Sequence, residues 1–106
     1  MIRKLLIALA ASVAVTLPAL ALYNITQVSV GTSATQILPE RGGRRAVTLI
    51  NHGTTDVYIG TTNTVTSSNG ALLTGTEGAS IRIEGAVQAI YGIAGTAQAI
   101  GVIEEY

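Results

Sequence analysis

Short runs of β-branched residues alternate with turn residues along most of this chain, and the stretch Arg44–Gly60 shows the pattern most completely. Residues 46–50 form one apolar run, residues 51–56 are polar, and residues 57–59 form a second apolar run that ends at a glycine. Apolar runs of this length that are bounded by Gly, Asn and Asp are typical of β-strands. The stretch therefore predicts a β-hairpin.

The same pattern continues on both sides of this stretch and predicts about seven to eight short strands. The candidates are Ile25–Val30, Thr35–Leu38, Ala46–Ile50, Val57–Ile59, Ala71–Leu73, Ala79–Glu84, Val87–Ile93 and Ala97–Ile103. The last two are predicted to form a terminal hairpin, because the glycines within and between them disfavour the alternative, a helix. Evenly spaced short strands predict an all-β fold, an antiparallel β-sandwich or a jelly-roll-like domain, preceded by an N-terminal hydrophobic helix.

Residues 1–21 have the three parts of an export signal. A basic start with Arg3 and Lys4 precedes an apolar run, Pro18 breaks that run, and Ala19-Leu20-Ala21 matches a small-residue cleavage site. We expect cleavage after Ala21, with Ala19 and Ala21 as the recognised residues. The run is also about long enough to cross a bilayer, so a retained membrane anchor or a buried helix stays open. Residues 22–106 then form the β-sandwich domain.

Charged residues make up only 11% of the chain, whereas apolar residues make up 48%. The surface of a freely soluble domain is normally richer in charge. The deficit favours a protein that packs against copies of itself or against neighbours. The chain also has no Phe or Trp and only four Tyr, so the predicted core is aliphatic.

Several kinds of chemistry are excluded by residues that are missing or rare. The absence of cysteine excludes disulfides, thiolate metal sites and cysteine nucleophiles. The only histidine, His52, is too few for a zinc site, which needs several His or Cys ligands. Residues 22–106 hold four arginines against six acidic residues, a formal charge of −2. We therefore expect no cofactor, no metal and no nucleic-acid partner.

Three arginines, Arg41, Arg44 and Arg45, lie beside Gly42 and Gly43. Guanidinium groups grip phosphate or carboxylate, and neighbouring glycines let a backbone approach, so the segment is a candidate anion site. Solvated charges, or ion pairs with acidic residues of the same or a neighbouring subunit, are the preferred interpretation. We predict these arginines as candidate partner contacts.

Two groups of residues contain side chains of the types that act in catalysis. His52 and Asp56 flank the predicted turn and suggest two members of a Ser-His-Asp triad, but no motif presents a nucleophilic serine, and turn formation explains both residues better. Glu84, Glu104 and Glu105 suggest a carboxylate pair or calcium ligands, but no calcium-loop motif accompanies them. The last two are interpreted as a polar chain end. We predict no catalytic residues.

The chain resembles small β-rich structural proteins of tailed bacteriophage virions over roughly residues 35–106. The residues that carry the likeness are Ile37-Leu38-Pro39, the segment 44–53, the segment 56–60, Ala89-Ile90-Tyr91-Gly92-Ile93-Ala94 and Val102-Ile103-Glu104-Glu105. The resemblance implies a domain that decorates a capsid, or forms part of a spike, fibre or tail attachment, as symmetric copies. Because most such proteins carry no export signal, residues 1–21 depart from this pattern.

These observations give a leading functional prediction and an alternative. The leading prediction is a non-enzymatic structural protein of a virion that assembles as a homo-oligomer with other virion proteins, with possible membrane contact through residues 1–21. The alternative is an exported β-sandwich binding module, processed after Ala21, that acts in the periplasm or at the cell surface.

Overall fold

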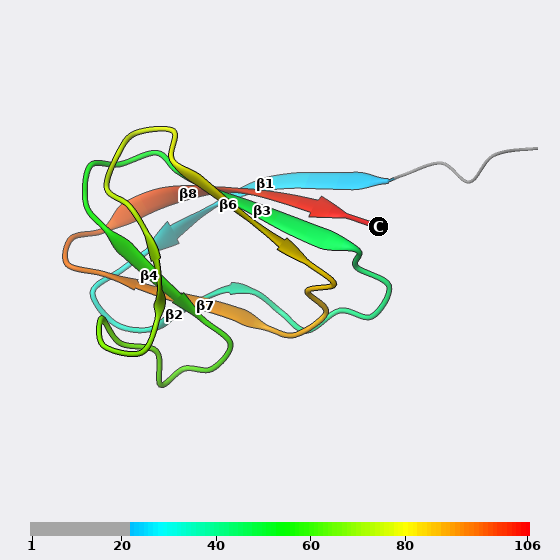
Figure 1. Ribbon diagram of the computed structural model, residues 1–106, viewed down its shortest axis with the longest axis horizontal. Helices are drawn as coiled ribbons and strands as arrows, with labels where there is room; N and C mark the ends of the chain where they lie inside the picture. Colours follow the sequence, from blue (N-terminus) through cyan, green and yellow to red (C-terminus); the bar gives the residue numbers. More distant parts are fainter. Residues whose placement is uncertain (1–21) are drawn as a thin grey trace, which may run out of the picture.

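The computed structural model describes residues 22–106, which form two four-stranded antiparallel sheets packed face to face (Figure 1). The strands are β1 (Tyr23–Val30), β2 (Thr35–Leu38), β3 (Ala46–Asn51), β4 (Val57–Gly60), β5 (Ala71–Leu73), β6 (Ser80–Glu84), β7 (Ile90–Ala94) and β8 (Gln98–Glu105). The first sheet has the order β1-β8-β3-β6 and the second has the order β2-β7-β4-β5. This is the strand order of a jelly roll. The predicted all-β class is confirmed, whereas the predicted N-terminal helix lies outside the described residues.

Each of the eight predicted segments overlaps a strand; β2 and β5 have the predicted ends, and the other six differ at one or both ends, most of all β7 and β8. β7 begins at Ile90, not at Val87, because the preceding carbonyls of Ala86 and Gln88 bind the Arg44 guanidinium. β8 continues through Glu105, since its carboxyl end pairs with both β1 and β3. Glu104 is therefore part of a strand in the interior of a sheet, and its interpretation as a polar chain end is wrong.

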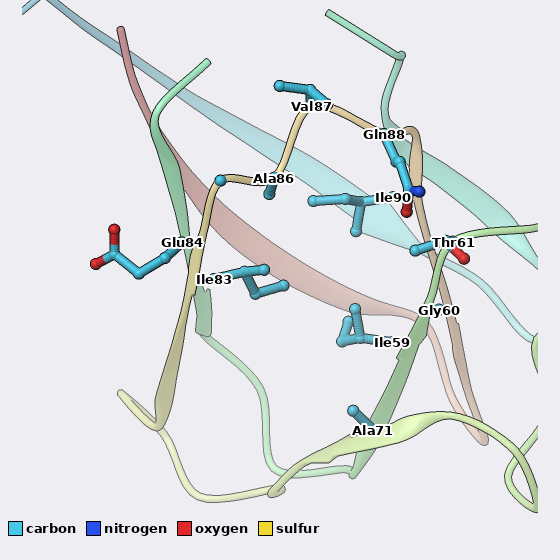
Figure 2. Close-up of a pocket in the computed structure, with 11 residues that line it drawn as sticks. Ile59, Gly60, Thr61, Ala71, Ile83, Glu84, Ala86, Val87, Gln88 and Ile90 are labelled. Atoms are coloured by element: carbon cyan, nitrogen blue, oxygen red, sulfur yellow. The ribbon is translucent and has the colours of Figure 1, made fainter. Parts of the chain in front are cut away.

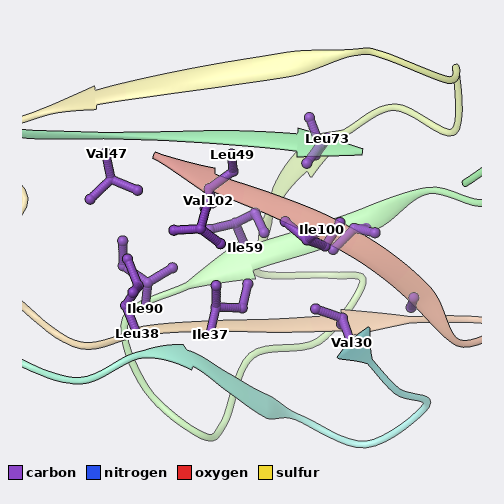
Figure 3. Close-up of a cluster of buried hydrophobic side chains, with 12 residues drawn as sticks. Val30, Ile37, Leu38, Val47, Leu49, Ile59, Leu73, Ile90, Ile100 and Val102 are labelled. Atoms are coloured by element: carbon purple, nitrogen blue, oxygen red, sulfur yellow. The ribbon is translucent and has the colours of Figure 1, made fainter. Parts of the chain in front are cut away.

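The predicted hairpin of residues 44–60 is also wrong, because β3 and β4 belong to different sheets. The alternation of apolar side chains is the same for neighbours in one sheet and for strands that face each other across a core. Here Leu49 of β3 and Ile59 of β4 both point into the space between the sheets (Figure 3). The predicted terminal hairpin fails in the same way, since β7 and β8 lie in opposite sheets. Among consecutive strands, only β4 and β5 pair with each other.

The core between the sheets is aliphatic, as the composition predicts (Figure 3). The buried cluster consists of Val30, Ile37, Leu38, Val47, Leu49, Val57, Ile59, Leu73, Ile90, Ala94, Ile100 and Val102. At about 25 cal/mol for each Å² of apolar surface removed from water, this cluster is the main stabilising contribution. Because no aromatic ring belongs to it, the two sheets are held apart by side chains of similar, small size.

The strand β3 carries a buried polar side chain at each end. Arg44 lies two residues before its first residue, and Asn51 is its last residue; both are almost completely buried. Each of these side chains is the centre of a group of buried hydrogen bonds, one at each end of the sandwich. These hydrogen bonds hold the loops at the two ends of the sandwich.

Candidate functional site

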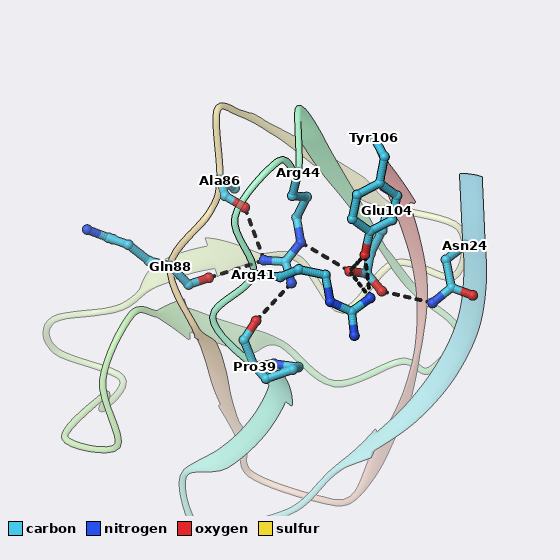
Figure 4. Close-up of polar contacts among 8 residues, drawn as sticks. All are labelled: Asn24, Pro39, Arg41, Arg44, Ala86, Gln88, Glu104 and Tyr106. Atoms are coloured by element: carbon cyan, nitrogen blue, oxygen red, sulfur yellow. Dashed lines mark hydrogen bonds and ion pairs between the residues drawn. The ribbon is translucent and has the colours of Figure 1, made fainter. Parts of the chain in front are cut away.

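The Arg44 side chain is buried at the end of the sandwich where both chain termini of the described region lie (Figure 4). Its Nη1 donates to the carbonyls of Ala86 and Gln88 at 3.0 and 3.2 Å, and its Nη2 donates to the carbonyl of Pro39 at 2.8 Å. Its Nε donates to Oε2 of Glu104 at 3.1 Å. One side chain thus joins two loops to the last strand.

The Glu104 carboxylate completes this cluster, which we call the Arg44 network (Figure 4). It accepts hydrogen bonds from the Tyr106 hydroxyl at 2.6 Å and from Nδ2 of Asn24 at 3.1 Å. Arg41 lies outside the cluster: its Nη1 is 3.7 Å from Oε2 of Glu104, it donates to the Tyr106 hydroxyl, and it stacks on that ring. Within the described residues, every buried side-chain polar atom of the network has a hydrogen-bond partner, so the network holds the fold together.

Protonation of Glu104 should destabilise the fold. Burial of the carboxyl acts to raise its pKa, but hydrogen bonds from Tyr106 and Asn24 and the charge of Arg44 outweigh burial and leave the pKa below its ordinary value of 4.5. A depressed pKa stabilises the folded state above the unfolded pKa, and this contribution is lost as the pH falls through the folded pKa. We expect the free energy of unfolding to hold from neutral pH to near 4.5 and to fall below it.

Denaturant unfolding at a series of pH values would measure this dependence, with Glu104→Gln as the comparison. Other carboxylates titrate in both proteins, so the difference between the two curves isolates Glu104. That difference should shrink as the pH falls. A constant difference from neutral pH to acid would contradict the assigned role of the charge.

The three arginines that the sequence marks as partner contacts occupy different environments. Arg44 is buried in the network and presents no guanidinium surface to a partner. Arg41 and Arg45 are exposed at the same end of the sandwich. The partner-contact prediction therefore stays a prediction for Arg41 and Arg45, and Arg44 is reassigned to the interior. The cleavage residues Ala19 and Ala21 lie outside the described residues.

The residues considered for a triad lie at the opposite end of the sandwich and are used in turns. Asp56 accepts a hydrogen bond from the backbone N–H of Gly75 at 2.6 Å. The backbone N–H of His52 donates to the carbonyl of Ala99, and its imidazole lies on the outer face above Gly101. Among the described residues, no hydrogen bond or ion pair joins His52 to Asp56.

Asn51 organises these turns from inside the fold. Its Nδ2 donates to the carbonyls of Thr55 and Thr74 at 2.9 and 3.0 Å, and its Oδ1 accepts from the N–H of Gly53 at 2.8 Å. The N–H of Thr55 donates a hydrogen bond to Oε1 of Gln98. Nothing in the sequence pattern singled out Asn51 beyond its turn propensity, because its role depends on a loop 23 residues away.

Among the described residues, the outer edge of β1 has no strand paired with it. Leu22, Tyr23 and Ile25 are the most exposed large apolar side chains of the described region, at 65%, 61% and 72%. Leu22 and Tyr106 exchange both backbone hydrogen bonds, and the β1–β8 register continues without a shift. Because bonded and non-bonded pairs alternate along an antiparallel ladder, every second residue of β1 faces away from β8. The outward N–H and C=O groups belong to Tyr23, Ile25, Gln27 and Ser29, which we call the β1 edge.

The other three sheet edges are short, interrupted or charged. β5 has three residues and β2 has four, and the register of β2 shifts just before Pro39. β6 has five residues and carries Arg82, which pairs with Glu84 and Glu105 across the outer face. Natural sheets use shortness, proline, irregularity and charge to prevent edge-to-edge pairing. β1 is eight residues long and contains none of these protections.

An apolar groove runs beside β1 on the outer face of the first sheet. Its walls include Ile25, Ile50 and Ile103, with His52 at one end, and its volume is about 550 Å³. Gly101 forms the floor, where a Cβ atom would lie 2.7 Å from Nε2 of His52. The groove extends the apolar character of the β1 edge onto the neighbouring strands.

Within residues 22–106, no group of three His, Asp or Glu side chains is arranged to hold a metal ion. In the same range there is no helix long and apolar enough to cross a membrane. The candidate site consists of the β1 edge and the groove beside it, a surface of backbone and apolar groups.

Comparisons with known proteins give a likeness of fold. No protein-family model and no curated protein matches the sequence. Among solved structures, the chain is similar to a subunit from Bacillus endospore appendages, which are described as a novel family of disulfide-linked pili. The TM-score is 0.50 at 12% sequence identity, over 82% of this chain and 86% of that chain. The present 106 residues contain no cysteine, so a disulfide link is not a shared feature.

Proposed function

We propose that this chain is a non-enzymatic structural subunit whose copies assemble into an extracellular appendage or a particle surface. The observation that carries the proposal is β1, an edge strand of eight uncharged residues whose first five side chains are all exposed. An edge of this length and composition is a template for pairing with another chain, and a protein that acts as a monomer normally blocks it. The low content of charged residues points the same way.

The polar interior supports the non-enzymatic part of the proposal. Arg44, Glu104 and Asn51 are the buried groups with the chemistry for catalysis, and each is fully engaged in structural hydrogen bonds. No buried side-chain polar atom of the described region lacks a partner. An active site needs groups that are held ready for a substrate, and these groups are committed to the fold.

Two biological settings fit this function. The likeness to appendage pili supports a surface filament, which is built from repeated contacts between copies. The sequence resemblance to tailed-phage structural proteins supports a virion component, as capsid decoration, spike or fibre. Both settings require association of copies, which is the part of the proposal that the β1 edge supports directly.

A specific observation favours an exported binding module as the second candidate function. An apolar pocket of about 430 Å³ opens between β6 of one sheet and β4–β5 of the other (Figure 2). Ile59, Ile83 and Ile90 form its inner wall, and Val87 lies at its rim. Because few polar groups line this pocket, it has little basis for recognising a polar ligand, and a hydrophobic ligand fits it best.

Isolation of the full chain from its native expression host tests the proposal. We expect ordered filaments or particles by electron microscopy, and a mass distribution far above the monomer by light scattering. Intact mass spectrometry of the same sample would show whether the chain begins at Met1 or at Leu22. A stable monomer at all accessible concentrations would contradict the structural function and favour the binding module.

A further inference from the structure

The partner of the β1 edge follows from backbone hydrogen bonding, and the inference rests on the proposed function. We propose that two copies of this chain pair through β1 in antiparallel orientation about a two-fold axis at Thr26, joining their first sheets into one eight-stranded sheet.

The groups that need partners are four amides and four carbonyls in a row. They belong to alternate residues, Tyr23, Ile25, Gln27 and Ser29, whose backbone faces away from β8. Unpaired groups on an exposed edge are satisfied by water, so pairing is favourable only if it removes apolar surface at the same time. Tyr23 and Ile25 supply that surface, since both are more than 60% exposed.

Among the strands that the structure describes, the only one of equal length at a sheet edge is β1 of another copy. The remaining edge strands have three, four and five residues, and each would leave part of β1 uncovered. Self-pairing places every residue of β1 against another uncharged residue. Because like charges directly opposite one another destabilise a strand pair, the absence of charge removes the usual obstacle to self-pairing.

The register follows from the number of hydrogen bonds. Pairing Tyr23 with Ser29 and Ile25 with Gln27 uses all four outward-facing residues of both copies, whereas a shift by two residues in either direction leaves an outward-facing residue without a β1 partner. Only residues with outward backbone groups can form hydrogen-bonded pairs, so shifts by one residue are excluded. The axis then passes between Thr26 of one copy and Thr26 of its partner.

The surfaces fit this register on both faces. On the outer face, Tyr23 lies opposite the small Ser29 and Ile25 lies opposite Gln27, and the two Ile25 side chains become diagonal neighbours within reach of each other. On the inner face, the threonines pair at the axis. The exposed first half of each β1 then lies beside the second half of the partner's β1. In that second half, Val28 and Val30 pack against the core of their own sandwich.

Cysteine cross-linking tests the register directly, because the natural chain has no cysteine. Residues at the axis form a non-hydrogen-bonded pair with Cα atoms about 4.5 Å apart, within the disulfide range of roughly 4.4–6.8 Å. The full chain with Thr26→Cys should form a disulfide-linked dimer under mild oxidation. Gln27→Cys is equally exposed but lies opposite Ile25, so we expect about ten-fold less dimer from its less favourable geometry.

Proline tests whether backbone pairing holds the copies together. The Gln27 N–H faces outward, so Gln27→Pro removes a group that β8 does not use, and edge strands tolerate proline at such positions. We expect Gln27→Pro to abolish the Thr26→Cys cross-link while the circular dichroism spectrum and melting temperature stay close to those of Gln27→Ala. Gln27→Ala should cross-link like the parent.

The outcomes separate this inference from the proposed function. Ordered assemblies in which Thr26→Cys cross-links no better than Gln27→Cys would overturn the two-fold pairing and leave the structural function intact. Assemblies that Gln27→Pro leaves unchanged would do the same. A protein that neither assembles nor cross-links contradicts both.

Discussion

Replacing Arg44 by methionine should lower the free energy of unfolding by about 3–5 kcal/mol, the usual cost of removing one member of a buried ion pair. The substitution keeps much of the side-chain volume but leaves the Glu104 carboxylate without its nearest cation. It also leaves the carbonyls of Pro39, Ala86 and Gln88 without a donor. The free energy of unfolding of a small domain is about 5–15 kcal/mol in total. This one substitution therefore removes a large part of it.

Arg45 provides a matched control for this experiment. It is the next residue in the chain and is exposed, so Arg45→Met makes the same chemical change without touching the interior. Substitutions of that kind usually alter stability by less than about 0.5 kcal/mol. Equilibrium denaturation of both variants would measure the difference, and equal effects at the two positions would refute the network as a main stabilising element.

Arg44→Lys separates charge from geometry. Lysine keeps the positive charge beside Glu104 but lacks the fork that reaches three carbonyls at once. We expect its stability to lie between that of the parent and that of Arg44→Met. A lysine variant as stable as the parent would show that the carbonyl contacts contribute little.

Replacing Asn51 by alanine should lower the free energy of unfolding by about 3 kcal/mol. Each buried polar group that is left without a partner costs roughly 1–3 kcal/mol, and the total stays below the full sum because water reaches some of these groups. The amide side chain satisfies the carbonyls of Thr55 and Thr74 and the N–H of Gly53. Its loss releases the β3–β4 and β5–β6 loops together. Asn63→Ala, in an exposed loop, makes the same change without buried partners and should be nearly neutral.

Hydrogen exchange would show where the Asn51 variant is weakened. We expect faster exchange at the N–H of Gly53 and of Thr55, which lie in the β3–β4 turn, and little change at the Arg44 end of the sandwich. Uniformly faster exchange would mean that the variant loses global stability without a local opening, and would contradict the assigned role in this turn.

The sequence was sufficient for the strands but not for their distribution between sheets. Alternation in segments such as Ser80–Glu84 marks the faces of a strand, and the structure has a strand in every predicted segment. Alternation does not say whether the next strand lies beside the first or across the core from it. Both predicted hairpins failed for that reason, because the choice depends on contacts such as those of Asn51 that join distant loops.

The buried residues of the Arg44 network illustrate a second limit. Glu104 shares a strand face with Ile100 and Val102, so the period of two would have placed it inside had the predicted segment Ala97–Ile103 been extended by one residue. Arg44 carries no such signal, since arginine beside glycines is typical of an exposed loop. Its burial depends on three carbonyls and a carboxylate that arrive from other parts of the chain.

The exchange of backbone hydrogen bonds between Leu22 and Tyr106 has a mechanical consequence. Tension between the two ends of the described region would open the β1–β8 ladder from that end, one bonded pair after another, which needs little force. A pulling force between Leu22 and the opposite end of the sandwich would load all the β1–β8 pairs at the same time. These pairs would then have to break together. Resistance to stretching in an assembly therefore depends on the point at which the neighbouring subunit holds the fold.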